Sequence, residues 1–268
     1  MRPTIVCTPR QLPAHLVVAA AQHAVKLNPM NHPDGEMVAL AAAGAPLPKE
    51  RLAVIIGRKW PTAGVQLTVG FLDNPPTGLR KKILSHMNAW SKSANVRFKE
   101  TKVDPQVRIA RASAPADVAG YWSYIGIDIL HIPKDEPTMN LEEFSMSVPD
   151  SEFHRVVRHE TGHTLGFPHE HMRRELVNKI DPTKAIAYFG RTQGWSAADV
   201  RAQVLTPIED SSLLGTLHAD PRSIMCYQIP GELTKDGKPI LGGKDIDKRD
   251  YTFAASIYPK TVLRRKAA

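Results

Sequence analysis

The stretch HETGHTLGFPHEH, residues 159–171, decides how the rest of the chain is interpreted. It contains the pattern H-E-x-x-H-x-x-G-x-x-H, with three histidines, one glutamate and one glycine fixed. Residues four apart on a helix lie about 40° apart around its axis, so the imidazoles of His159 and His163 can aim at one point. Gly166 tolerates the left-handed conformation that ends a helix, and the turn can return His169 as a third ligand.

The pattern suits a catalytic metal ion. Three neutral imidazoles around zinc leave a fourth position for water, which distinguishes a catalytic site from a closed structural one. Glu160 is turned about 100° from His159, so it can reach that water as a base without binding the ion. The alternative is that these are ordinary histidines in a chain that has 11 of them. We favour one Zn²⁺ ion bound by His159, His163 and His169, because the full pattern would occur by chance in about one chain in ten thousand.

A second motif lies 54 residues after the third histidine, where residues 223–227 read SIMCY. It resembles the methionine turn that runs beneath the zinc of metzincin metalloproteases. The resemblance narrows to the astacin family, because residues 166–171 with Arg173, and GYWSYIG at residues 120–126, are similar to astacin segments. The similarity spans about residues 60–259.

The resemblance implies roles for individual residues. Met225 would pack beneath the ligands without binding the ion. Tyr227 matches the astacin tyrosine that is a fifth zinc ligand and that can swing to stabilise the oxyanion. The segment around Trp122, Ser123 and Tyr124 would form a sheet edge where an extended peptide substrate pairs as an added strand. The alternative for these aromatic residues is ordinary core packing, and both can hold together.

The chain departs from the family in its cysteines. Astacins carry disulfides, and one of them uses a cysteine where this chain has Tyr121, whereas only Cys7 and Cys226 are present here. The chain is therefore better described as astacin-like. A bond between Cys7 and Cys226 would pin the N-terminal segment near the active site, and two free thiols are the alternative.

The composition changes along the chain. Residues 1–50 are rich in proline and alanine, and we predict that they form an N-terminal extension, either a prosegment or a strap. Residues 51–260 would be the catalytic domain and residues 261–268 a basic tail. Metzincin prosegments often supply a side chain to the open zinc position, and Cys7 or Asp34 could do so. The alternative is that Cys7 packs in the core and Asp34 caps a turn.

Hydrophobic periodicity predicts strands and helices before the zinc motif and mainly helices after it. Together with the resemblance, this order implies an α+β, metzincin-like two-lobed fold. A twisted mixed sheet with two long helices would lie above the cleft, and the lower lobe would be mostly irregular or helical. Asp150 or Ser151 would cap the zinc helix. Asp181, followed by proline, resembles an N-cap, and Ser196 with Asp199 resembles a capping box. Strands are expected at 65–71, 96–98, 107–109 and 127–132, and further helices at 13–27, 79–90, 182–188, 196–205 and 245–258.

Composition limits the partners. The 268 residues are 42% hydrophobic and 23% charged, as in ordinary globular proteins. No run approaches eighteen apolar residues, and the N-terminus is a poor secretory signal, so we expect a soluble protein, either cytoplasmic or exported by a route not visible here. The net charge of +8 favours acidic partners, but no nucleic-acid motif accompanies it. A polypeptide substrate is expected, without membrane insertion, and the oligomeric state is open.

These observations favour a zinc-dependent endopeptidase with Glu160 as general base. One alternative is a zinc-holding module that captures peptides without cleaving them. Another keeps the enzyme but makes the chain a latent precursor, held inactive by its first 50 residues. A serralysin-like or matrixin-like protease is the runner-up within the clan, although the absence of glycine-rich calcium repeats argues against a complete serralysin.

Overall fold

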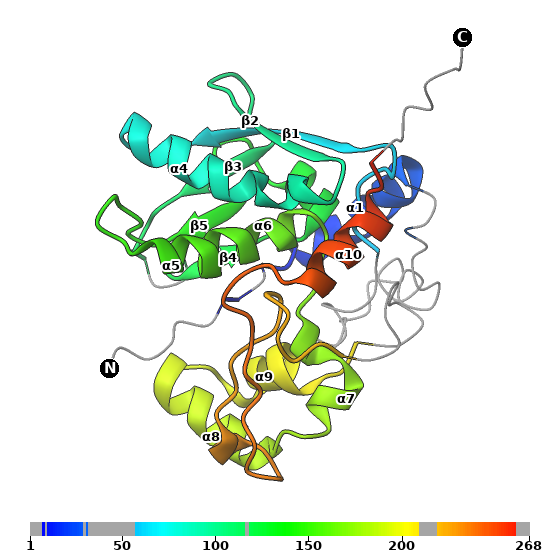
Figure 1. Ribbon diagram of the computed structural model, residues 1–268, viewed down its shortest axis with the longest axis vertical. Coiled ribbons are helices and arrows are strands. Elements are labelled where there is room, and N and C mark those ends of the chain that lie inside the picture. Colours follow the sequence, from blue (N-terminus) through cyan, green and yellow to red (C-terminus); the bar gives the residue numbers. More distant parts are fainter. Residues whose placement is uncertain are drawn as a thin grey trace.

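The computed structural model describes residues 7–8, 10–28, 31, 57–115, 118–208 and 219–260. Asp34, most of the remaining extension and the predicted basic tail lie outside these ranges. The described chain forms two lobes, with the sheet in the upper one and short helices in the lower one (Figure 1). This is the α+β architecture that the sequence predicts.

The upper lobe is built on a five-stranded mixed sheet in the order β2-β1-β3-β5-β4. Four strands are parallel, and β4 pairs antiparallel with β5 at one edge. In β1 the apolar residues Val65, Leu67 and Val69 are buried and alternate with more exposed ones, as a half-buried strand requires. The strands are β1 (Val65–Phe71), β2 (Val96–Glu100), β3 (Val107–Ala110), β4 (Tyr121–Ser123) and β5 (Met139–Leu141).

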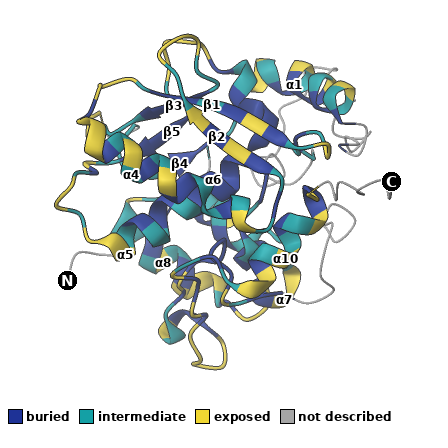
Figure 2. Ribbon diagram, turned by 45° about the horizontal axis from the view of Figure 1, so that its top comes forward, coloured by how far each residue is buried: buried dark blue, intermediate teal, exposed yellow. Residues whose placement is uncertain are grey.

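Two helical runs cover one side of the sheet. The first is α4 (Thr77–Met87), which continues into the 3₁₀ turn η1 (Asn88–Lys92). The second, which we call the zinc-motif helix (residues 150–164), joins α5 (Asp150–Glu152), the π-helical turn η3 (Phe153–Val157) and α6 (Arg158–Thr164). In Figure 2 the strands and α6 are mostly buried, whereas exposed residues recur along α4. Two further helices, α1 (Ala14–Leu27) and α10 (Lys248–Ile257), complete the upper lobe.

The lower lobe has its own apolar core, which includes Leu176, Phe189 and Val204. Asp181 caps α8 by accepting a hydrogen bond from the Lys184 amide, and a capping box opens α9, both as the sequence predicts. The elements are η4 (Glu170–Met172), α7 (Arg174–Val177), α8 (Pro182–Gln193), α9 (Ala197–Val200), the π-helical turn η5 (Arg201–Leu205) and η7 (Gly231–Leu233).

Two predictions about elements are wrong. Residues 127–132 do not form a strand but lie largely in the 3₁₀ helix η2 (Gly126–His131). Gly126 has φ +52°, and its chain bends so closely over Arg58 that a Cβ would lie 1.8 Å from the Arg58 carbonyl oxygen. A short apolar run is equally compatible with a buried strand or helix, which is why periodicity failed here. Neither Asp150 nor Ser151 caps the zinc-motif helix, because Pro149 is its N-cap residue and makes no side-chain cap bond.

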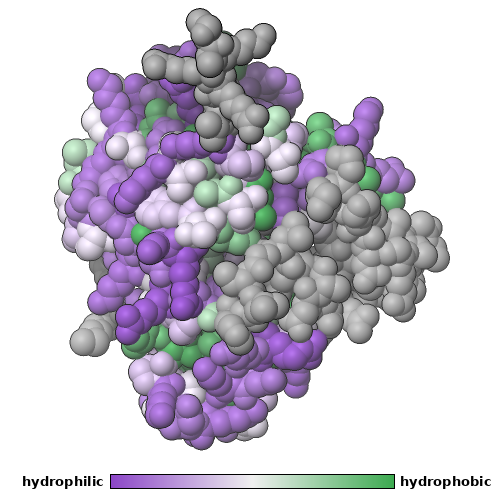
Figure 3. Space-filling model, turned by 45° about the vertical axis from the view of Figure 1, so that its right-hand side comes forward, coloured by the Kyte–Doolittle hydropathy of each residue, from purple (hydrophilic) through white to green (hydrophobic). Residues whose placement is uncertain are grey.

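The described surface in Figure 3 is mostly polar, and the two cysteines are not linked. On the described part of the face in Figure 3, hydrophilic side chains predominate and hydrophobic ones form small, separated groups. Among the described residues, no helix combines the length and apolarity needed to cross a membrane. Cys7 and Cys226 are both buried and free, so the disulfide alternative is not realised.

Candidate active site

The three motif histidines meet between the lobes. His169 Nε2 lies 3.2 Å from Nε2 of His159 and 3.0 Å from Nε2 of His163. His159 directs Nδ1 to the carbonyl oxygen of Ile224 at 2.6 Å, and His163 directs Nδ1 to that of Phe167 at 2.8 Å. A carbonyl oxygen only accepts, so both Nδ1 atoms carry the proton and both Nε2 atoms present lone pairs to the third ring.

This arrangement fits a zinc ion. Nitrogen ligands bound tetrahedrally at 2.0–2.1 Å from zinc lie about 3.3 Å apart, close to the separations found here. Burial lowers the pKa of His159 to about 4 and lowers the pKa values of His163 and His169 well below their usual range. The rings are therefore neutral, which is the form that binds metal. Convergent lone pairs of this kind are stabilised by a cation, and each Nδ1 bond fixes its ring in the ligating orientation.

The turn after the helix depends on glycine. Gly166 has φ +91°, and its amide donates to the His163 carbonyl at 2.8 Å. This left-handed residue reverses the chain, as the motif predicts, and delivers His169 to the group.

Met225 lies beneath the motif. A Cβ on Gly162 would be 2.4 Å from Met225 Sδ, so the thioether packs directly against the zinc-motif helix. The Met225 carbonyl accepts from the Glu170 amide at 2.8 Å, next to the third histidine. The methionine turn is held in turn by Asp250 of α10, which accepts from the Ser223 hydroxyl at 2.6 Å and from the Ile224 amide at 2.9 Å.

Glu160 and Cys7 are in contact beside the histidines. Cys7 Sγ donates to Glu160 Oε2 at 3.3 Å. One potential ligand atom from each of Cys7, His159, His163 and His169 lies within 4.8 Å of the others. Burial raises the pKa of Glu160 to about 8, and burial together with the Glu160 charge raises the pKa of the Cys7 thiol. The structure therefore places Cys7 beside the three histidines that could bind the metal ion.

Tyr227 lies against the same group. Its ring stacks on His171 with centroids 3.9 Å apart and packs on His169 at 4.3 Å. Its hydroxyl donates to the backbone carbonyl of Cys7. Burial raises the pKa of Tyr227 well above its usual range, so the hydroxyl is a proton donor at neutral pH.

The predicted sheet edge is β4, and the N-terminal segment lies along it. The Thr8 amide donates to the Tyr121 carbonyl at 3.2 Å, and the Arg10 amide donates to the Ser123 carbonyl at 3.0 Å. Arg10 pairs in a parallel sense with Tyr124, and its guanidinium lies 4.4 Å from the centre of the Trp122 ring. We call residues 7, 8 and 10–12 the strap.

Three contributors to the site were missed by the sequence analysis. Thr8 and Arg10 bond through backbone amides, which any residue except proline provides, so no motif marks them. Asp250 supports the methionine turn from α10, and its only signal is the capping box that it forms with Asp247. That signal predicts a helix start but gives no indication of the contact with Ile224.

The fold and the site together define a metzincin-type zinc metalloprotease architecture. More narrowly, the chain belongs to the astacin family, because the model of the Astacin peptidase family matches residues 55–188. This match decides against the serralysin-like and matrixin-like alternatives. Zinc dependence is a property of this family, and the histidine group is the part of the described chain that suits the ion.

Individual relatives agree with this assignment. Zinc metalloproteinase nas-27 of Caenorhabditis elegans is 28% identical over 165 residues, which are 56% of this chain and 35% of the relative. The chain thus spans about a third of that curated relative. A structure of myroilysin is 32% identical, with a TM-score of 0.70, and the match covers 76% of this chain and 97% of that one. The hatching enzyme HCE-1 of Oryzias latipes (Medaka fish), a zinc-protease, is 17% identical over 76% of this chain and 94% of its own, with a TM-score of 0.51, and shows similarity of fold alone.

Proposed function

We propose that this chain is a zinc endopeptidase that hydrolyses polypeptides. The observation that carries the proposal is the convergence of three neutral imidazoles beside a buried carboxyl group, Glu160. His159, His163 and His169 would hold one zinc ion, and Tyr227 would be a further ligand or a donor at the same centre. When bound, zinc polarises a substrate carbonyl and lowers the pKa of the water that it holds.

Glu160 would act as the general base. Its carboxylate takes the proton of the attacking water and returns it to the leaving amine. A pKa near neutrality suits both transfers, and burial raises the pKa of Glu160, with Cys7 beside it, to about 8. The Tyr227 hydroxyl would donate to the oxyanion of the tetrahedral intermediate. The β4 edge at Trp122, Ser123 and Tyr124 would align the substrate by backbone pairing.

We further propose that the chain with its strap is the latent form. The strap takes the backbone positions of the β4 edge, so an incoming peptide meets no free carbonyl at Tyr121 or Ser123. The Cys7 thiol lies beside the metal ligands and Glu160, and the Tyr227 hydroxyl is bound to the Cys7 carbonyl. The strap therefore contacts the proposed general base Glu160, the proposed oxyanion donor Tyr227 and the β4 edge at the same time. Asp34, the other latency candidate, lies outside the described residues.

The endopeptidase proposal is tested by digesting unfolded casein with zinc-loaded protein after removal of the strap, and by identifying the products by mass spectrometry. Glu160→Gln should retain zinc, measured by metal analysis, and should lose cleavage by about 10²–10⁴-fold. Chelation should abolish cleavage, and added zinc should restore it. Zinc-loaded protein that binds casein but never cuts it would identify a peptide-binding module instead.

A further inference from the structure

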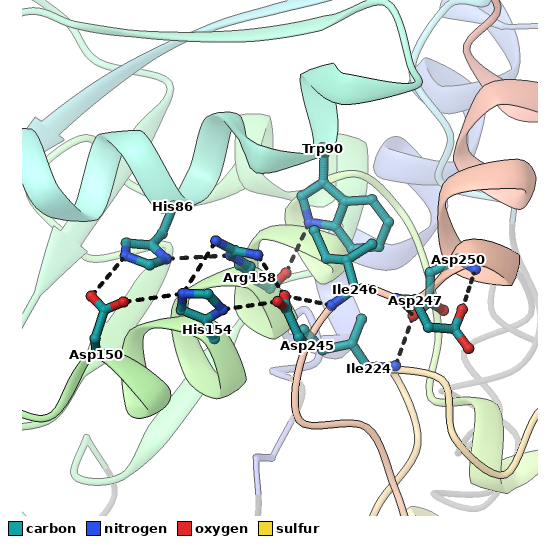
Figure 4. Close-up of polar contacts among 10 residues, drawn as sticks. All are labelled: His86, Trp90, Asp150, His154, Arg158, Ile224, Asp245, Ile246, Asp247 and Asp250. Atoms are coloured by element: carbon teal, nitrogen blue, oxygen red, sulfur yellow. Dashed lines mark hydrogen bonds and ion pairs between the residues drawn. The ribbon is translucent and has the colours of Figure 1, made fainter.

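Three further ligand-type side chains meet where α4 faces the start of the zinc-motif helix (Figure 4). His86 Nε2 lies 3.5 Å from Asp150 Oδ1, and His154 Nε2 lies 3.2 Å from Asp150 Oδ2. One potential ligand atom from each residue lies within 4.8 Å of the other two. Ligands bound tetrahedrally to zinc lie about 3.3 Å apart. The two contacts with Asp150 are already close to that separation, and the three side chains would draw together from within 4.8 Å to share one ion.

The fold brings the three together through helix geometry. Asp150 and His154 are four residues apart and lie on the same helical face. His154 belongs to the π-helical turn η3, and such turns occur frequently at functional sites. His86 comes from the last turn of α4, and its ring centre lies 5.0 Å from that of His154.

An outer carboxylate orients one ligand. His154 Nδ1 lies 2.8 Å from Asp245 Oδ2, which leaves Nε2 directed at Asp150. Asp245 is itself fixed, because its Oδ1 accepts from Arg158 Nη1 at 2.5 Å and from the Ile246 amide at 2.7 Å. Metal-binding histidines almost always donate their other nitrogen to a partner of this kind.

The site is also accessible. The His86 side chain is 9% exposed and that of His154 is 31%, whereas that of Asp150 is 64% exposed. An ion can therefore enter from solvent past Asp150, and water can complete its coordination. Burial and the Arg158 charge lower the pKa of His86, so its imidazole is neutral and able to ligate.

Two positively charged side chains, Lys82 and Arg158, contact the atoms that would bind the ion. Lys82 Nζ lies 3.2 Å from Asp150 Oδ1, and Arg158 Nε donates to His86 Nδ1 at 3.3 Å. The proton of neutral His86 is therefore on Nε2. Arg158 Nη2 also lies 3.5 Å from His154 Nε2. An incoming ion would require the His86 proton to move to Nδ1, and Arg158 would give up both histidine nitrogens while keeping Asp245. These exchanges cost affinity, so binding should be weaker than at the motif histidines.

We propose that His86, Asp150 and His154 form a second zinc site, with Asp245 orienting His154. Two imidazoles and one carboxylate are a ligand set that suits zinc and leaves a position for water. A bound ion would cross-link α4 to the zinc-motif helix, which carries the first site one turn further on. The proposal does not depend on peptide hydrolysis.

The test is a zinc titration of the full chain after chelation, in competition with a chromophoric chelator. Native protein should take up two equivalents, the second more weakly. Asp150→Ala and His86→Ala should each retain only the first, and Asp245→Asn should weaken the second by about 10–100-fold. His15→Ala, which changes an exposed histidine on α1, is the matched control and should retain both.

Stability supplies an independent measurement. The second equivalent should raise the thermal midpoint of native protein by mass action but not that of Asp150→Ala. Asp150 is largely exposed, so its replacement should leave the far-ultraviolet circular dichroism unchanged. A single equivalent in native protein would overturn the proposal. A second equivalent that survives both Asp150→Ala and His86→Ala would also overturn it, because binding would then be adventitious.

Discussion

Tyr227 would act through one atom, its hydroxyl oxygen. Phenylalanine keeps the ring that packs on His169 and His171, so the Tyr227→Phe change isolates the hydroxyl. We expect strap-free Tyr227→Phe protein to lose about 10²–10³-fold in kcat, the usual effect of removing one oxyanion donor, with little change in KM. Steady-state cleavage of a fluorogenic peptide measures both. An unchanged kcat would exclude the oxyanion role, whereas weaker zinc binding would identify a ligand.

His171 makes stability depend on pH. Burial lowers its pKa to about 3, and Nε2 donates to the Gln203 carbonyl at 2.9 Å. The folded chain keeps this ring neutral, while the unfolded chain protonates it near pH 6.5. The contribution of the neutral His171 ring to the free energy of unfolding is therefore fully present above about pH 6.5. It is lost as the pH falls toward 3, at up to about 1.4 kcal/mol per pH unit.

The measurement is the free energy of unfolding in urea, with chelator, across this range. His171→Gln should make the dependence less steep, because one of the buried histidines that unfolding protonates is gone, whereas His159, His163 and His169 keep the remainder. His15→Gln, at an exposed position, should leave the slope as it is in native protein. Equal slopes in all three proteins would contradict the assignment to His171.

Two glycines with positive φ, each in or next to a helix, allow the cost of a left-handed backbone to be measured apart from the cost of a steric clash. At Gly194, which ends α8 with φ +69°, a Cβ would meet nothing within 4 Å. Gly194→Ala should therefore cost only the left-handed conformation, about 1–2 kcal/mol. At Gly126 a Cβ would also lie 1.8 Å from the Arg58 carbonyl oxygen, so Gly126→Ala should cost more than about 3 kcal/mol. Thermal unfolding of the two variants compares these costs, and equal losses would show that Arg58 yields easily.

The same elements show what could be predicted. The alternation of apolar and polar residues was enough to predict β1, and N-capping side chains were enough to predict the starts of α8 and α9, because these signals lie within the elements themselves. η2 was predicted as a strand, since its conformation follows from the approach of Arg58, some 70 residues earlier in the chain. In the site, the motif spacing was enough to predict that His159, His163 and His169 converge. The strap was beyond sequence reasoning, because its pairing with β4 uses backbone groups that every residue shares.

If the strap keeps the whole molecule latent, removal of a short N-terminal segment should make the β4 edge and the candidate active site accessible to substrate. Removing residues 1–11 takes away Cys7, Thr8 and Arg10 but keeps α1 and its contacts with η2. Casein cleavage should rise at least about tenfold, because a tethered competitor present at high effective concentration has been lost. Cys7→Ala should give a smaller rise, since the β4 edge stays paired. Equal activity in the deleted and full-length chains would disprove the latency.

Tyr258, near the end of the described chain, joins distant segments. Its hydroxyl donates to the Leu165 carbonyl at 2.6 Å and accepts from the Trp60 amide at 3.1 Å, and its carbonyl accepts from the Asn95 amide at 2.8 Å. Asp250, about two helical turns earlier, holds the methionine turn. During synthesis on the ribosome, these bonds form only after Tyr258 has emerged from the exit tunnel, when all the segments that it joins are already outside. A nascent chain that has not yet exposed Asp250 and Tyr258 therefore lacks these supports of the methionine turn and of the end of the zinc-motif helix.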